Sequence, residues 1–388
     1  MDKELFGSGP HGLLDFAIEI SKHDNRIDRC KKHDGRTIAF VTLCAVLSGF
    51  RGWEEIGEYG KCKQSLMEEY LGPLDGMPSH DTISRFFSLL KPESFEGVYR
   101  EWILEIFRLR SSPPKDGGYR DQIAVDGKEM CGARDDSPVR MVSAYAVKSG
   151  ISLGQKKVEE KTNEIPALQE LVAELDVSGC IVTADAMHCQ KKTCKAIIEG
   201  GGNFFLFAKG NQEKLKQAVK EAVEVAMAHP RNNNDRYKTI DKPDGKGWWI
   251  RQCIAVGEPL YLGRLHKEWP ELHSFGIIIS ERPGEKEVIR EERYFITSLK
   301  MNAELFLQTA RNHWAVENGL HWRLDVDFQE DKSRKKKNAA INFSLINKMA
   351  MAILSFDKKK EPLRRKRQRA ALKEEYLKQL LGKLEEIL

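Results

Sequence analysis

The chain has 388 residues, of which 41% are hydrophobic, and its formal net charge is only +5. This length predicts two or three folding units, and the composition excludes a disordered protein. No signal peptide or membrane span is expected, because charged residues follow Met1 and the most apolar stretch, 38–47, is too short to cross a bilayer. Eight irregularly spaced cysteines predict reduced thiols and a cytoplasmic location.

The first part of the chain has a helical pattern. Apolar residues recur at helical spacing through residues 10–110, and Ser79 is expected to cap the helix that follows it. The stretch SSPPKDGG at 111–118 has the composition of a linker. We therefore place the first domain boundary there and predict an N-terminal helical domain over 1–112.

After the linker the apolar period changes from helical to strand-like. The pattern predicts strands at 122–125, 140–147 and 152–158, and then alternating helices and strands at 164–175, 179–184, 190–198, 203–209 and 212–228. Three further strands, at 248–256, 276–280 and 294–298, are interpreted as a β-rich insertion over 232–300. Helix returns from residue 302, and a charged helix is expected over 363–388. The fold class is therefore mixed α/β.

Three acidic residues stand in contexts that suit metal-dependent phosphate chemistry. Asp126 in IAVDGK and Asp185 in IVTADA each follow an apolar, β-branched run, which is how a buried strand carries a carboxylate to the edge of a sheet. A plain turn is the alternative for Asp126, because Asp-Gly is a common turn pair. Glu317 in HWAVEN lies in a helical pattern, but four nearby acids compete with it for the third position: Asp325, Asp327, Glu330 and Asp331.

Basic and aromatic residues surround and follow Glu317. Trp314, Glu317 and His321 are spaced so that they share one face of a helix. Two basic runs follow, KSRKKK at 332–337 and KKKEPLRRKRQR at 358–369. Such runs are usually solvated, but they also attract polyanions, so double-stranded DNA is the leading partner. No phosphate-binding loop motif occurs, and no nucleotide cofactor is expected.

Long motifs in this chain resemble the DDE-type insertion-sequence transposases, in particular the H-repeat-associated group. They are VDGK at 125–128, MVSAYAV at 141–147, LGQKKVEEKTNEIPAL at 153–168, IVTADAMHCQ at 181–190, AKGNQ at 208–212 and HWAVENGLHWRLDVDFQED at 313–331. The resemblance implies an RNase H-like core and two divalent cations, usually Mg²⁺. It also implies that the protein cuts and joins the ends of a mobile DNA element.

The same resemblance assigns residues and segments. Asp126, Asp185 and Glu317 would be the catalytic, metal-binding carboxylates. Residues expected to contact DNA, including two from the first basic run, are Lys209, Arg311, His313, Trp314, Asn318, His321, Trp322, Lys332 and Arg334. The predicted segments are 1–112 for binding DNA ends, 119–231 for the first part of the core, 232–300 for the insertion, 301–357 for the final core helices and 358–388 for a basic C-terminal helix.

Two other functions remain open from the sequence. The chain could be a DNA-binding protein derived from a transposase, or a nuclease without strand transfer. A homodimer that pairs two element ends is a further expectation, and no membrane partner is expected.

Overall fold

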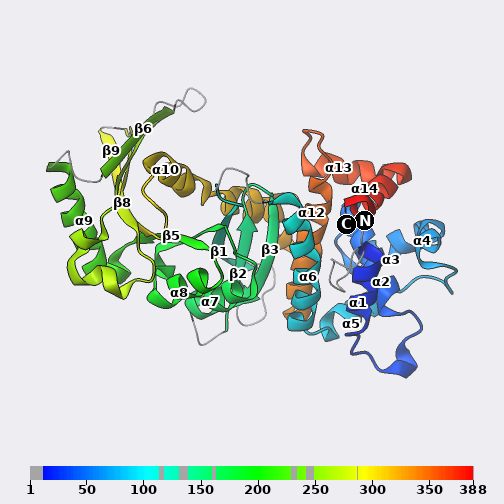
Figure 1. The fold of residues 1–388 in the computed structure, drawn as a ribbon. Coiled ribbons are helices and arrows are strands. Elements are labelled where there is room, and N and C mark those ends of the chain that lie inside the picture. Colours follow the sequence, from blue (N-terminus) through cyan, green and yellow to red (C-terminus); the bar gives the residue numbers. More distant parts are fainter. Residues whose placement is uncertain are drawn as a thin grey trace, which may run out of the picture.

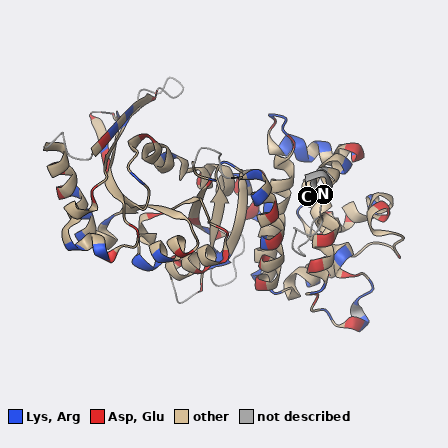
Figure 2. Ribbon diagram, in the orientation of Figure 1, with Lys and Arg blue, Asp and Glu red and all other residues tan. Residues whose placement is uncertain are grey.

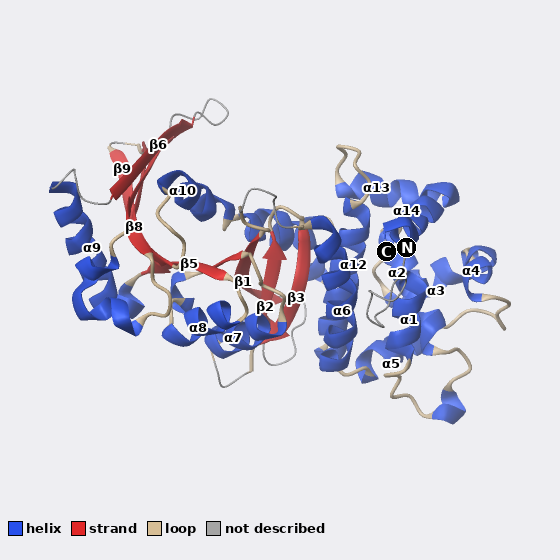
Figure 3. Cartoon of the chain, viewed as in Figure 1, coloured by secondary structure: helices blue, strands red, loops and turns tan. Residues whose placement is uncertain are grey.

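The computed structural model describes residues 12–112, 118–130, 139–159, 163–228, 234–241, 249–285 and 287–387. Helices gather at one end of the molecule and a long twisted sheet occupies the other (Figures 1 and 3). The first and last described helices, α1 (Leu13–Ser21) and α14 (Glu374–Ile387), both lie within the helical part (Figure 1). The mixed α/β fold class that the sequence predicts is therefore confirmed.

The N-terminal region is helical, as predicted. Its elements are α1 (Leu13–Ser21), η2 (Asp28–Cys30), α2 (Gly35–Leu47), α3 (Trp53–Cys62), α4 (Gln64–Leu71), α5 (His80–Leu89) and α6 (Pro92–Arg110). The Ser79 side chain accepts a hydrogen bond from the backbone N–H of Thr82 and so caps α5, as expected. Helix α2 is buried along almost its whole length and forms the centre of this region.

A single sheet runs through the rest of the described chain. Its strands are β1 (Gln122–Met130), β2 (Val139–Ala146), β3 (Ile151–Lys157), β4 (Ile181–Ala184), β5 (Asn203–Ala208), β6 (Asn234–Asp241), β7 (Trp249–Val256), β8 (Ser274–Pro283) and β9 (Val288–Thr297). The order is β3-β2-β1-β4-β5-β9-β8-β7-β6. Strands β1, β2 and β3 pair antiparallel, whereas β1, β4 and β5 pair parallel. These five strands form the RNase H-like core.

The predicted insertion extends this sheet instead of forming a separate one. Strand β9 pairs antiparallel with β5, and β8, β7 and β6 follow outward. Strand β6 was not predicted, because charged residues such as Arg236 and Lys238 alternate along it and no residue in it is fully buried. It is the edge strand of the sheet, where charged side chains are common. The predicted strand start at Trp248 lies outside the described residues.

Helices cover both faces of the sheet. On one face lie α7 (Glu164–Glu174) and α8 (Lys191–Glu199), with α9 (Glu213–Ala228) beside the outer strands (Figure 1). The opposite face is covered by α10 (Ala303–Asn312), η7 (Glu317–His321), α11 (Trp322–Val326) and α12 (Lys337–Ser355). Short turns complete this part: η4 (Ala186–His188), η5 (Gly210–Gln212), η6 (Pro259–Glu268) and η8 (Glu330–Lys332).

The C-terminal end packs against the N-terminal helices. Helix α12 contacts α2, α5 and α6 as well as β3. The single helix expected over 363–388 is two helices, α13 (Leu363–Leu372) and α14 (Glu374–Ile387), because Lys373 between them has an extended backbone. None of the described helices is long and apolar enough to cross a membrane. The five-segment division of the chain remains a prediction.

Candidate active site

Two carboxylates lie side by side where the parallel ladder between β1 and β4 ends. The last paired residues are Val125 and Ala184, so Asp126 is the next residue of β1 and Asp185 is the residue that directly follows β4. Side chains alternate along a strand, which places both carboxylates on the face covered by α10 to α12. Strand β1 continues beyond Asp126, which pairs with Ser143 of β2. Asp126 is therefore not part of a turn, and the strand is longer than the sequence predicted.

Gly127 explains the small residue after the first acid. A Cβ at this position would lie 2.3 Å from the Glu164 Oε2 atom at the start of α7. The glycine thus lets α7 pack closely on the face opposite the carboxylates. Its role is packing within a strand, whereas the Asp-Gly pair alone had suggested a turn.

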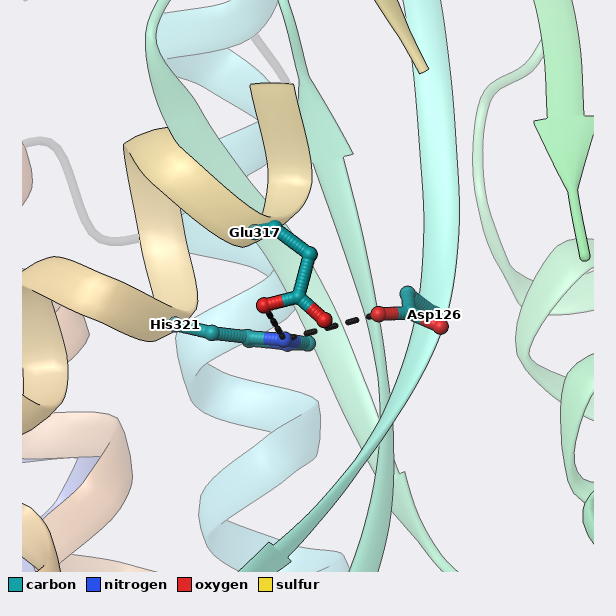
Figure 4. Close-up of side chains that lie close together, drawn as sticks. All are labelled: Asp126, Glu317 and His321. Carbon is teal, nitrogen blue, oxygen red and sulfur yellow. Dashed lines mark ion pairs between the residues drawn. The ribbon is translucent and has the colours of Figure 1, made fainter. Parts of the chain in front are cut away.

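The third acid arrives on a short π-helical turn. Glu317 is the first residue of η7 and His321 is the last. Figure 4 shows both side chains pointing from this turn toward Asp126 on β1. The His321 Nδ1 atom is 3.5 Å from Asp126 Oδ2 and 3.7 Å from Glu317 Oε2. π-Helical turns often occur at functional sites, because the extra residue redirects side chains.

The turn is held against the sheet at Gly319. A Cβ there would lie 2.7 Å from the Tyr145 Oη atom of β2. Val316 and Leu320, on either side of this glycine, are buried in the core. This packing fixes the distance of the η7 turn, and so of Glu317 and His321, from β1.

Ionisation is costly for Asp126. Burial, followed by the negative charges of Asp185 and Glu317, raises the pKa of Asp126 to about 7. Its side chain is 16% exposed, whereas those of Asp185 and Glu317 are 63% and 49% exposed. Asp126, the most buried of the three, therefore has a charged form that is costly to bury. The cluster is open to solvent on the side of Asp185 and Glu317.

Asp185 is stabilised in its charged form by a histidine. His313 Nε2 lies 3.6 Å from Asp185 Oδ1. The hydrogen bond from His313 lowers the pKa of Asp185 and outweighs burial, which acts in the opposite direction. The other ring nitrogen, Nδ1, is 3.1 Å from the Thr183 hydroxyl. Thr183 precedes Asp185 by two residues and lies on the same face of the sheet. The pair therefore fixes the orientation of the histidine ring.

His321 is a buried, neutral histidine. It is 4% exposed, and burial, with the nearby cations Lys348 and Lys128, lowers its pKa to about 3. Lys348 is buried in α12 and donates a hydrogen bond to Ser143 Oγ. Ser143 is the cross-strand partner of Asp126, so this cation lies close to Asp126 on the same face of the sheet. Neutral imidazole is the form of histidine that binds metals.

Two of the four alternatives for the third acid, Asp325 and Glu330, are paired with a lysine. Lys128 Nζ pairs with Asp325 and lies 3.3 Å from Glu330 Oε2. These contacts separate both acids from the cluster. Among the described residues, the potential metal-binding group contains Asp126, Glu317 and His321, with one ligand atom from each within 4.8 Å of the others.

The other residues expected to contact DNA fall into two sets. Exposed side chains are those of Lys209, Arg311, Trp314, Asn318, Trp322, Lys332 and Arg334. His313 and His321, which were also expected to contact DNA, are buried and lie beside the carboxylates. A sequence signal for this was present, because both histidines lie four residues from Glu317, a spacing that brings helical side chains together.

The residues present fit a divalent cation. Carboxylates that repel one another at short distance are stabilised by a cation between them. Oxygen ligands suit hard ions such as Mg²⁺. Asp126, Asp185 and Glu317 supply such oxygens, and His321 adds a nitrogen donor.

Comparison with known proteins identifies the family. The transposase DDE domain family matches residues 118–354, and the DDE_Tnp_1-associated family matches residues 21–103. The "H repeat-associated putative transposase YhhI" of Escherichia coli (strain K12) is 36% identical over 364 residues, which cover 90% of this chain and 93% of that protein. The "Putative transposase YncI" of Escherichia coli O157:H7 is 33% identical over 384 residues, covering 97% and 95%.

Among solved structures, a piggyBac transposase synaptic complex with hairpin DNA is 12% identical, with a TM-score of 0.38 over 96% of this chain and 81% of that chain. The assignment of the family rests on the sequence matches. The chain belongs to the DDE transposases, DNA-processing enzymes that bind DNA and use divalent metal ions.

Proposed function

We propose that this protein cuts DNA at the ends of a mobile element and joins the freed 3′ hydroxyls to target DNA. Asp126, Asp185 and Glu317 would hold two divalent cations, most suitably Mg²⁺. The observation that carries the proposal is the convergence of these acids, 59 and 132 positions apart along the chain: Glu317 joins Asp126 in one potential metal-binding group, and Asp185 follows the strand beside Asp126 and acts on its charge. Bound cations would stabilise charge on the attacking and leaving oxygens of the phosphodiester.

The protein's own residues would prepare and orient the reacting groups. Hydrogen bonding to His313 keeps Asp185 charged, so this acid is available for a cation near neutral pH. Lys209 follows β5 at the same edge of the sheet, and its charge also acts on Asp185. An exposed lysine at that edge could bind a DNA phosphate beside the carboxylates. Exchange of one phosphodiester for another requires no nucleotide cofactor.

DNA would run along the exposed basic and aromatic side chains near Glu317. Trp314 and Arg311 lie beside Trp249 and Arg251 of β7, around a cavity of about 330 Å³. Arg251 also stacks on Trp249, 4.7 Å from the ring centroid. Arginine and tryptophan together can bind phosphates and stack on bases. We assign this surface to DNA near the cut site, and the helices before residue 112 to the element ends.

Two element ends must be brought together for insertion, so we propose that two copies of the chain act in one complex. The substrate also implies a cytoplasmic protein associated with the nucleoid. Contacts to DNA phosphates would make binding fall steeply as salt rises.

The proposal is tested with DNA that carries the element's own ends. Protein and Mg²⁺ are expected to nick this DNA, and a pre-cut end with a free 3′ hydroxyl is expected to yield joined product. Asp126→Asn, which keeps the size of the side chain, should abolish both reactions while DNA binding persists. A parent protein that binds these ends without nicking them would favour the DNA-binding alternative. Nicking without joining of the pre-cut end would indicate a nuclease.

A further inference from the structure

We propose that His321 is a direct ligand of the cation held by Asp126 and Glu317, so that this site has one nitrogen donor and two carboxylate donors. The inference rests on the proposed function and refines it, because it names a ligand beyond the three acids. It also changes the role of His321 from a contact for DNA to a part of the metal site.

The spacing of the ligand atoms supports this assignment. Ligands of small divalent ions lie about 2.0–2.2 Å from the metal, so neighbouring ligands on one ion are roughly 3–3.5 Å apart. His321 Nδ1 lies 3.5 Å from Asp126 Oδ2 and 3.7 Å from Glu317 Oε2. Figure 4 shows the three side chains converging from the η7 turn and from β1. Only a small inward movement would bring them to one ion.

The position of His321 is fixed by packing. Leu320 beside it is fully buried, and Gly319 lies against Tyr145 with no room for a side chain. The histidine ring is therefore held next to Asp126 by the fold of the turn itself. Metal sites need ligands that are held in place in this way.

A second observation concerns the other ring nitrogen. Nε2 of His321 is buried and has no hydrogen-bond partner among the described residues. Leaving such a group unpaired costs about 1–3 kcal/mol. If His321 only filled the core, nothing would compensate for the unpaired nitrogen, and an apolar side chain would be more stable at this position. Binding of a cation through Nδ1 offsets the cost.

A nitrogen ligand alters the choice of metal. Imidazole suits transition-metal ions such as Fe²⁺, Ni²⁺ and Zn²⁺, whereas Mg²⁺ prefers oxygen. Mn²⁺ also prefers oxygen, but as a transition-metal ion it accepts a nitrogen ligand more readily than Mg²⁺ does. The site should therefore bind Mn²⁺ more tightly than Mg²⁺, and replacement of His321 should reduce that preference. Removal of a carboxylate would instead weaken binding of both ions.

The test is pulsed electron paramagnetic resonance on the full chain loaded with Mn²⁺, which detects a coordinated ¹⁴N nucleus directly. We expect nitrogen coupling in the parent protein and in His313→Gln, and its loss in His321→Gln. His313→Gln is the matched control, because it removes a second buried histidine beside a carboxylate. Titration should show Mn²⁺ affinity about tenfold weaker in His321→Gln, with a smaller change for Mg²⁺. Circular dichroism checks that each variant is folded.

Other outcomes would overturn the inference. Bound Mn²⁺ without nitrogen coupling in the parent protein, or coupling that persists in His321→Gln, would remove His321 from the site. Coupling lost in His313→Gln alone would identify His313, and not His321, as the nitrogen ligand. In each case a parent protein that still cuts and joins DNA would leave the proposed function intact. That function fails separately if Asp126→Asn is as active as the parent.

Discussion

Replacing Asp126 by asparagine should make the metal-free protein more stable, although it should abolish activity. The carboxylate is largely buried beside two other acids, and its pKa is raised to about 7 from an ordinary 3.8. Its negative charge therefore opposes folding at neutral pH whenever no cation is bound. Asparagine has nearly the same shape and no charge, so it removes this penalty.

The size of the effect follows from the difference between the two pKa values. At about 1.4 kcal/mol per pKa unit, the penalty above pH 7 is roughly 4 kcal/mol. This is an upper bound, and we expect asparagine to recover about 2–4 kcal/mol. Because the folded pKa is raised, the penalty is absent below the unfolded value of 3.8. It grows as the pH rises and is complete above about 7.

Thermal unfolding in EDTA measures this effect. At pH 8, Asp126→Asn should unfold several degrees above the parent protein, and the difference should shrink as the pH is lowered toward 4. Asp121→Asn, immediately before the same strand, is the matched control. The Asp121 carboxylate accepts hydrogen bonds from the backbone N–H groups of Lys148 and Ser149, so its replacement should lower stability.

Addition of Mn²⁺ or Mg²⁺ should reverse the order. A cation that binds only the folded state stabilises the parent protein by an amount that grows with the logarithm of its concentration above Kd, and it should have little effect on Asp126→Asn. Equal or lower stability of Asp126→Asn at pH 8 in EDTA would refute the reasoning. It would mean that burial and the neighbouring acids do not destabilise the charged form of Asp126.

Three further substitutions probe the surroundings of the carboxylates. Replacement of His313 by alanine should raise the pKa of Asp185, so metal-dependent cleavage should be lost at a higher pH on the acidic side of the pH–rate profile. Gly319→Ala should cost about 1–3 kcal/mol in denaturant unfolding and impair cleavage, and Tyr145→Ala in the same chain should partly restore both. Lys209→Ala should weaken DNA binding and reduce the slope of log K against log salt by about 1.

Much of the core could be predicted because periodicity reports burial directly. The strand segments that precede Asp126 and Asp185 are continuous apolar runs, since parallel strands are covered on both faces. For that reason the sequence could place both acids next to buried strands of one sheet. It could not separate Glu317 from Asp325 or Glu330, because the decision depends on Lys128, which pairs with the latter two across the fold.

The roles of the two histidines required the structure. An ordinary helical pattern puts Trp314, Glu317 and His321 on one face, but the backbone between Glu317 and His321 is a π-helical turn. In the fold, Trp314 is exposed, whereas His321 is buried against β1. A single extra residue in a turn is invisible to a periodicity argument, because it changes direction without changing composition.

Not every residue of the two basic runs is available to bind DNA, because some of them are buried. Helix α13 carries several basic residues (Figure 2), yet Arg367 is buried and its guanidinium donates a hydrogen bond from Nε to the Val46 carbonyl. Lys335 of the earlier run lies 3.8 Å from the centre of the Phe343 ring and donates to the Arg51 carbonyl.

These side chains join the C-terminal helices to the N-terminal ones, and a buried cation already satisfied by protein groups cannot also neutralise a phosphate. The cations free to contact DNA are therefore a subset of those in the sequence, and they include the exposed Lys332 and Arg334. Loss of DNA binding after replacement of a buried basic residue would report the separation of two packed helical regions, and its salt dependence would not change. Exposure, more than the number of basic residues, determines how many phosphates this protein can neutralise.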